Sequence, residues 1–218
     1  HMSNSALPIN FNNTEKAFAY KTDSDLKRAR LLFSAMQFAP LVKLGTKITP
    51  WAIKSGLPIK GIIKNTLFQQ FVGGESLEET VVVADMLEKF NVQVILDYGV
   101  EGGEGNEEKY EAEANYFIEV IQFASTRKNI PFISIKITGL VSSSLLEKLN
   151  TTLSSKSTEP MSTRFNNRLD QLSHEEQAQW EQLITRTKRL CQAASDAGIG
   201  LMIDAEESWI QDAIDAVA

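Results

Sequence analysis

The chain has 218 residues, of which 43% are hydrophobic and 23% charged, the proportions of an ordinary globular protein with one good core. Its formal net charge of −6 argues against nucleic acid as the main partner. The single cysteine, Cys191, excludes an internal disulfide and is expected to pack inside a helix. His174, the one histidine outside the terminal His1-Met2 pair, argues against a histidine-based metal site or a Ser-His-Asp triad.

The first 22 residues predict a polar arm, in which His1-Met2 resembles the remnant of an expression tag. A basic helical lead-in is predicted over 23–66, with its first helix beginning near Asp23 or Ser24. Between residues 26 and 74 the chain has eight basic residues and no acidic one, interleaved with apolar side chains. This segment is either a solvated helical face or a surface that contacts a membrane or an acidic partner.

From residue 67 to residue 218 the patterns of strand and helix alternate. Short apolar runs predict strands, and amphipathic stretches between them predict helices, two of which begin with a capping box (Ser76 with Glu79, Ser173 with Glu176). The predicted strands are 67–72, 92–96, 131–137 and 199–203, and the helices are 76–90, 107–126, 143–150, 174–197 and 208–217.

Strands of this kind, separated by helices, predict an α/β protein with a parallel sheet and helices outside it. Two architectures share the pattern: a doubly wound open sheet and a TIM-type (β/α)8 barrel. Four β/α units would make half of such a barrel, which usually needs about 250 residues. In either architecture the chemistry gathers at the carboxyl ends of the strands.

Charged and polar residues follow each predicted strand. Lys136 is the least ordinary, because it interrupts a run that is otherwise built for burial. A lysine in a central strand must find an anionic partner, reach solvent or lose its charge. It either forms an ion pair with Asp97 or Asp204, or lines an anion-binding active site. Asp97 and Asp204 could instead cap the helices that follow them. The glycines at 102, 103 and 105 fail as a dinucleotide fingerprint and predict a loop.

Four segments, each at a predicted strand end and in the same order, resemble the motifs of the flavin-dependent proline dehydrogenases. They are Phe71-Val-Gly-Gly-Glu-Ser76, Val94-Ile-Leu-Asp-Tyr-Gly-Val-Glu101, Ser134-Ile-Lys-Ile-Thr-Gly-Leu140 and Leu201-Met-Ile-Asp-Ala-Glu-Glu207. The resemblance covers about residue 65 to the end, and is closest to the monofunctional members. It implies a distorted (β/α)8 barrel, of which this chain holds the first four units over 67–218.

The resemblance also implies a function. The family binds FAD, oxidises L-proline to Δ1-pyrroline-5-carboxylate in proline catabolism toward glutamate, and passes the electrons to a membrane quinone. Lys136 matches the lysine that helps to neutralise the proline carboxylate beside the flavin. Asp204 matches the active-site aspartate of strand four, in the polar network around substrate and isoalloxazine. Glu101 matches a glutamate that pairs with a substrate-binding arginine, and Asp97 matches an acid with a structural role.

The family's Tyr-Leu-Arg-Arg-x-x-Glu-Asn motif has no counterpart in these 218 residues, and most FAD contacts come from strands five to eight. We therefore expect the chain alone to be inactive and to associate with itself or with the other half of a barrel. Two alternatives remain: a barrel aldolase with Lys136 as the Schiff-base lysine, and a non-catalytic interaction module. The expected location is cytoplasmic, or mitochondrial in a eukaryote, with peripheral contact at the inner membrane.

Overall fold

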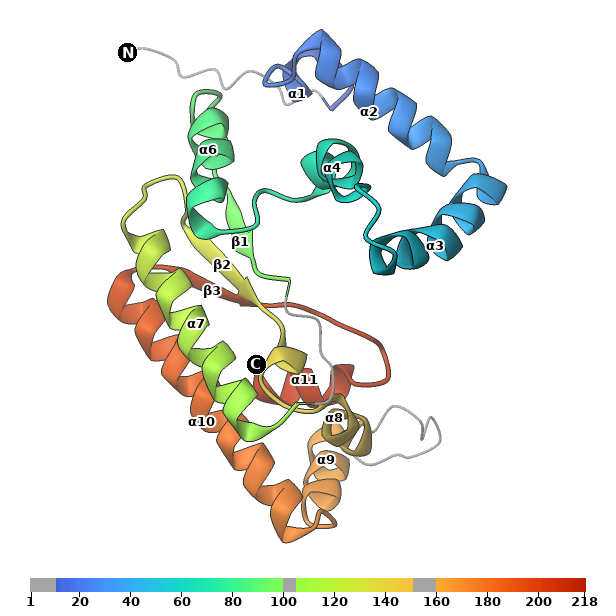
Figure 1. Cartoon of the computed structure of the whole chain (residues 1–218). Coiled ribbons are helices and arrows are strands. Elements are labelled where there is room, and N and C mark those ends of the chain that lie inside the picture. The colour runs from blue at the N-terminus through green and yellow to red at the C-terminus, as the bar shows by residue number, and fades with distance from the viewer. Residues whose placement is uncertain (1–10, 100–104, 151–159) are drawn as a thin grey trace, which may run out of the picture. The chain divides into compact units, whose positions relative to one another are not determined.

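The computed structural model describes residues 11–99, 105–150 and 160–218. It divides into two compact units, His1–Val92 and Gln93–Ala218, which are described separately (Figure 1). The predicted tag remnant and part of the predicted arm lie outside the described residues, as do Glu101, Gly102 and Gly103.

The first unit is helical throughout its described residues. Its longest early helix, α2, begins where the sequence predicts, because Thr22 and Asp25 cap each other: the Asp25 N–H donates to Thr22 Oγ1 at 3.2 Å, and the Thr22 N–H donates to Asp25 Oδ2 at 3.1 Å. The helices are α1 (Thr14–Ala17), α2 (Asp23–Met36), α3 (Ala39–Lys54), α4 (Lys60–Ile63), the π-helix η1 (Lys64–Phe68), α5 (Gln69–Phe71) and α6 (Leu77–Glu88).

The prediction of a strand over 67–72 is wrong, because these residues continue a helical segment through η1 and α5. The apolar positions explain the difference. Leu67, Phe68, Phe71 and Val72 are spaced i, i+1, i+4 and i+5, which places them on one side of a helix rather than on alternating faces of a strand. Only Val72, which ends α5, has an extended backbone.

The helix predicted to begin at Ser76 is confirmed as α6, but half of its capping box is replaced. The Ser76 hydroxyl accepts from the Glu79 N–H at 3.3 Å, while the Glu79 carboxylate accepts from the N–H of Glu75, at 2.9 Å, and not from that of Ser76. Glu79 therefore accepts a hydrogen bond from Glu75, the residue before the N-cap.

The second unit alternates strands and helices (Figure 1). The last three predicted strands and the helices after them are confirmed, with shorter strands than the patterns suggest. Phe165, on a helix that the sequence does not predict (α9), packs against Trp180 with ring centroids 5.5 Å apart. The elements are β1 (Ile95–Asp97), α7 (Glu107–Ser125), β2 (Phe132–Ile135), the 3₁₀ turn η2 (Ile137–Gly139), α8 (Ser143–Leu149), α9 (Met161–Leu169), α10 (His174–Ala197), β3 (Gly200–Ile203) and α11 (Gln211–Val217).

Helix α10 has both end signals that the sequence predicts. Ser173 and Glu176 form a complete capping box, and Gly198 ends the helix in the left-handed conformation with φ of 68°. His174 is exposed in the first turn. Cys191 is exposed as well, so the expectation that it packs inside is wrong. The packed face of α10 is carried instead by residues such as Leu183, Leu190 and Ala194, at helical spacing.

The parallel sheet that the sequence predicts is confirmed. Its strands are parallel and lie in the order β1-β2-β3, so each strand pairs with the next along the chain. The connecting helices α7 and α10 pack against each other and lie side by side on one face of the sheet (Figure 1). Three successive parallel strands with α7 and α10 on one face occur both in a barrel and in one half of a doubly wound sheet, so both architectures are compatible with the described strands.

The two faces of the sheet differ in burial. Ile133 and Ile135 point toward the helices and are fully buried, together with Phe117 and Ile121 of α7 and Leu183 and Leu190 of α10. Burying each such side chain contributes about 1.5–3 kcal/mol. On the other face, large apolar side chains remain open: Ile95 is 52% exposed, and Phe132 and Met202 are each 44% exposed.

Arg186 of α10 joins this helical layer to the end of β2. Its side chain is 4% exposed and donates to the Leu140 carbonyl at 3.1 Å, to Glu111 Oε2 at 3.3 Å, to Gln182 Oε1 at 3.0 Å and to Glu107. Its guanidinium carbon also lies 5.9 Å from the centre of the Tyr110 ring. One buried cation therefore connects α7, α10 and the residue after η2.

Replacing Arg186 by alanine is expected to lower the free energy of unfolding by about 3 kcal/mol, because it removes a buried cation and leaves the Leu140 carbonyl unpaired. R189A removes a cation from the same cluster that is 39% exposed, and is expected to cost less than about 1 kcal/mol. Urea unfolding followed by circular dichroism measures both. Equal losses for the two variants would contradict the structural role given to Arg186.

The hydrogen bond from Arg189 Nη1, at 2.6 Å, is the main reason that the pKa of Glu111 is lowered; burial opposes it, and Arg186 adds to the lowering. A carboxyl group with a lowered pKa stabilises the fold above its unfolded pKa, and this stability disappears as the pH falls through the folded value. E111Q should therefore be less stable than the parent near pH 7, by less than about 1 kcal/mol since Glu111 is 43% exposed. The difference should vanish at pH values below the folded pKa, as measured by urea unfolding at several pH values.

Candidate active site at the strand ends

Three rows of side chains cross the open face of the sheet. The register pairs Ile95 with Phe132 and Phe132 with Gly200, then Asp97 with Ser134 and Ser134 with Met202. Lys136 and Asp204 are the next same-face residues along β2 and β3, one row nearer the carboxyl ends. The predicted site residues Lys136 and Asp204 therefore share one edge of the sheet, beyond an apolar row.

Both acids after β3 are bound by hydroxyl groups of the β2 segment. Ser134 Oγ donates to Asp204 Oδ1, although the two residues are 70 positions apart. Glu206 accepts from the Thr138 N–H at 3.1 Å and also from the Thr138 hydroxyl. The Asp204 N–H donates to the Ile135 carbonyl at 3.0 Å, which extends the ladder by one bond. The acids are thus held toward β2 by Ser134 and Thr138, which stand on either side of Lys136 in sequence.

Lys136 lies in extended backbone, with φ of −107° and ψ of 127°, so the alternation of β2 continues to its side chain. The side chain is half-buried. Neither predicted ion pair, with Asp97 or with Asp204, forms among the described residues. Asp97 is exposed, and Asp204 is bound to Ser134. Within the described part of the chain, Lys136 thus has no carboxylate partner and can receive an anionic ligand.

The alternative role of the acids as helix caps is also wrong. Helix α7 is capped by Asn106, whose Oδ1 accepts from the Lys109 N–H at 2.9 Å. Helix α11 follows Ile210, without a side-chain cap. Asp97 and Asp204 are therefore not needed to start helices.

Glu101, the third predicted site residue, lies outside the described residues. The end of its loop is described: the Gly105 N–H donates to the Tyr110 hydroxyl at 2.9 Å. Among the described residues, no group of His, Cys, Asp and Glu side chains could hold a metal ion.

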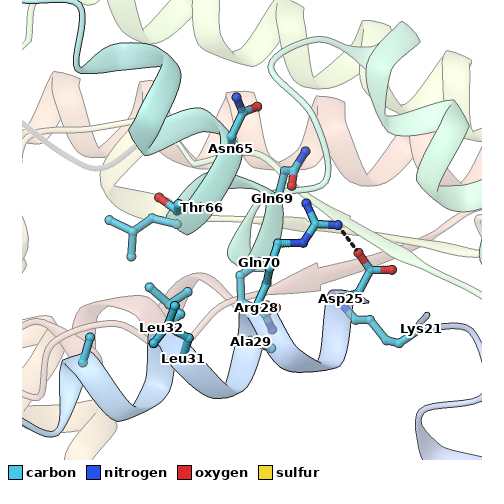
Figure 2. A pocket seen from close by; sticks show the side chains of 12 residues that line it. Lys21, Asp25, Arg28, Ala29, Leu31, Leu32, Asn65, Thr66, Gln69 and Gln70 are labelled. Atoms are coloured by element: carbon cyan, nitrogen blue, oxygen red, sulfur yellow. Dashed lines mark hydrogen bonds and ion pairs between the residues drawn. The ribbon is translucent and has the colours of Figure 1, made fainter. Parts of the chain in front are cut away.

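One hollow of about 540 Å³ lies in the helical unit, between α2 and the η1–α5 segment (Figure 2). Leu31 and Leu32 line it from α2 and Gln69 and Gln70 from α5, and Arg28 bonds to Asp25 at its rim at 2.7 Å. None of the predicted site residues lines this hollow. The strand ends remain the candidate active site.

Comparison with known proteins assigns the family. The sequence profile of the family described as "Proline dehydrogenase" matches residues 81–218, which is more than half of the chain. The chain belongs to the proline dehydrogenase family. It is thus a relative of oxidoreductases, and its strand-end residues fall inside the matched region.

Individual relatives support the family assignment. The chain is 30% identical over 177 residues to "Proline dehydrogenase 1, mitochondrial" of Dictyostelium discoideum, covering 72% of this chain and 31% of that protein. It is 25% identical to the Arabidopsis thaliana protein of the same name, covering 96% and 47%. It is 23% identical to "Hydroxyproline dehydrogenase" of Xenopus laevis, covering 92% and 46%. The chain spans between about a third and a half of the length of these proline dehydrogenase relatives.

Two residues that hold the strand ends in place, Ser134 and Arg186, are not among the predicted site residues. Ser134, the partner of Asp204, stands two positions before Lys136, so a period-two reading of the strand would have placed both on one face. Arg186 stands between Leu183 and Leu190 on the apolar stripe of α10, where a charged residue signals a buried partner. Both signals were present in the sequence, but neither names the partner.

The pair of bonds from Thr138 to Glu206 is expected to fix the turn directly after Lys136. E206Q and T138V should each lower the free energy of unfolding by about 1–2 kcal/mol, because a bond to a charged acceptor is lost. The double variant should cost clearly less than the sum of the two. E207Q, at the exposed neighbouring carboxylate, is the control and should change stability by less than about 0.5 kcal/mol. Additive effects of E206Q and T138V would contradict the coupling.

Proposed function

We propose that this chain forms part of a flavoenzyme that oxidises L-proline to Δ1-pyrroline-5-carboxylate and passes the electrons to a quinone. The observation that carries the proposal is the position of Lys136. It is a lysine without a carboxylate partner among the described residues, beside Asp204 at the carboxyl edge of a parallel sheet, in a chain of the proline dehydrogenase family. A free cation at this edge suits a substrate that carries a carboxylate.

In this proposal Lys136 binds and orients the carboxylate of proline. The ammonium group is attached to the rigid end of β2, and the turn after it is bound to Glu206 through Thr138, so little freedom is lost when the substrate arrives. Asp204, oriented by Ser134, supplies a fixed negative charge and hydrogen-bond acceptor in the same row. Glu101 is proposed to help close the site over the substrate, and Asp97 to serve a structural role.

The residues present fit one end of an FAD site. The open face offers apolar side chains, Phe132 two rows before Lys136 and Met202 on the neighbouring strand, and a flat aromatic ring with a developing negative charge needs both an apolar surface and a cation. We therefore propose Lys136 and Asp204 as cofactor-facing residues as well as substrate-binding ones. When bound, FAD would supply the hydride acceptor for the oxidation of proline.

The fold proposed for the whole protein is the (β/α)8 barrel of the family. The helical lead-in of 23–66 would precede the barrel part of 67–218. The family match supports this assignment, and three parallel strands in the order β1-β2-β3, with α7 and α10 on one face, are compatible with it. The remaining strands would cover the open face, whether they belong to the same protein or to an associated copy. We infer a cytoplasmic or mitochondrial protein that meets its quinone at a membrane surface.

A second candidate substrate is hydroxyproline. A relative named hydroxyproline dehydrogenase aligns over 92% of this chain, at 23% identity. The carboxylate and the ring nitrogen are common to both substrates, so Lys136 would serve either. The ratio of kcat/KM for proline and 4-hydroxyproline decides between them. A Schiff-base aldolase has no comparable support, and borohydride trapping of a carbonyl compound on Lys136 would be required to favour it.

The test uses the protein at its full natural length, loaded with FAD. K136M should lower kcat/KM for proline by about 100-fold or more, because the carboxylate would enter the site without its counter-charge. The same variant should weaken binding of a non-oxidisable carboxylate analogue of proline, followed by the change in the flavin absorbance. K128M, at an exposed lysine after α7, is the control and should change neither. Full activity and full analogue binding in K136M would overturn the role of Lys136.

A further inference from the structure

Asp204 has two neighbours on β2 that could bind its carboxylate. The last pair of the strand register joins Ile135 to Ile203. The next residues, Lys136 and Asp204, therefore stand opposite each other, and the Asp204 N–H continues the ladder with its bond to the Ile135 carbonyl at 3.0 Å. Adjacent strands are about 4.8 Å apart, so a lysine in this position can reach the carboxylate. Ser134 lies on the same face, one row before Lys136.

The structure shows Asp204 bound to its diagonal neighbour and not to the residue opposite. The Ser134 hydroxyl donates to Asp204 Oδ1. Among the described residues no ion pair joins Asp204 to Lys136, although opposite charges at this separation attract each other. Ser134 is only 5% exposed, and a hydroxyl buried to this extent needs an acceptor within the protein. The bond to Asp204 supplies that acceptor and fixes the direction of the carboxylate.

The second acid at this edge is restrained in a similar way. Glu206 accepts from the Thr138 N–H at 3.1 Å and from the Thr138 hydroxyl. Its own N–H donates to Gln211 Oε1 at 3.0 Å, so both its backbone and its side chain are bound. The two acids after β3 are therefore engaged by hydroxyl groups that flank Lys136 in sequence. Because hydroxyl groups are neutral, these bonds leave the charge of the lysine uncompensated.

We propose that Ser134 is a positioning residue, which holds the Asp204 carboxylate away from the Lys136 ammonium and so keeps this cation available to the carboxylate of the substrate. An ion pair between Lys136 and Asp204 would have to be broken each time an anionic ligand arrives, and the hydroxyl of Ser134 removes this competition. The inference rests on the proposed oxidation of proline for the identity of the substrate. The arrangement of the three side chains depends on neither flavin nor substrate, so it can be tested alone.

The first test is the rate at which a trace of acetic anhydride labels Lys136 in the 218-residue chain at constant pH, followed by peptide mass spectrometry. The exposed Lys128 is the internal reference. S134A should release Asp204 to pair with Lys136 and slow the labelling of Lys136 by about tenfold, because an ion pair keeps the ammonium group protonated and unreactive. S134A/D204N, which also removes the negative charge, should return the rate to that of the parent.

Two further variants guard against a purely structural effect. S134C, with a thiol of similar volume that donates more weakly, should label at an intermediate rate. S125A removes an exposed serine hydroxyl at the end of α7, which donates to the Gln122 carbonyl at 2.7 Å, and should label like the parent. Circular dichroism checks that each variant is folded. Equal labelling of Lys136 in S134A and the parent, or a slow rate that D204N does not restore, would overturn the proposal.

The second test uses the protein at its full natural length, loaded with FAD. S134A should raise KM for proline by about tenfold and change kcat much less, because the competing ion pair weakens binding in the ground state and the transition state alike. S125A should change neither constant. Slowed labelling of Lys136 with an unchanged KM would overturn the link to substrate binding. Full activity in K136M would overturn the proposed function and leave the labelling result unaffected, so the two failures are distinguishable.

Discussion

The packing of the second unit depends on the hydrogen bonds of one buried cation, Arg186. Arg186 is almost fully removed from water, and an arginine in that position is stable only if its donors are used. Its partners come from α7, from its own helix and from the backbone of Leu140. The same side chain therefore holds the two connecting helices together and ties them to the residue that follows η2. Since η2 lies between Lys136 and Leu140, this contact anchors the end of the turn that follows the candidate active-site lysine.

The two faces of the sheet carry different kinds of side chain. The side chains of β2 toward the helices are isoleucines with no exposed surface, and they supply the apolar burial that holds the strands. The side chains toward the open face supply an apolar row, then hydroxyls, then a lysine and acids. The pairing of Ser134 with Asp204 and of Thr138 with Glu206 shows how the second set is ordered. Each acid after β3 is oriented by a hydroxyl of the β2 segment, which leaves the one cation of the row unpaired among the described residues. This distribution of charge is the basis for the proposal that Lys136 binds the carboxylate of the substrate.

The helical unit presents a different kind of surface. Two of its acids pair with particular cations, Asp25 with Arg28 and Glu75 with Lys64. The lysines of α3 have no such partners within the described chain, and they flank the largest exposed apolar side chains of that helix.

The sequence by itself determined the elements whose signals are local. The capping residues Thr22 and Ser173, the left-handed Gly198 and the apolar runs of β2 and β3 each act within a few residues, so their patterns are sufficient. Four ordered motifs also determined the family, and Lys136 stood out because a charge in a buried run is costly. Only the tertiary structure decided the rest. The exposure of Cys191 depended on which face of α10 meets α7. Apart from Gln182, the partners of Arg186 and of Asp204 lie about 40 to 80 residues away in sequence, and strand register and helix packing, which no local pattern encodes, bring them within bonding distance.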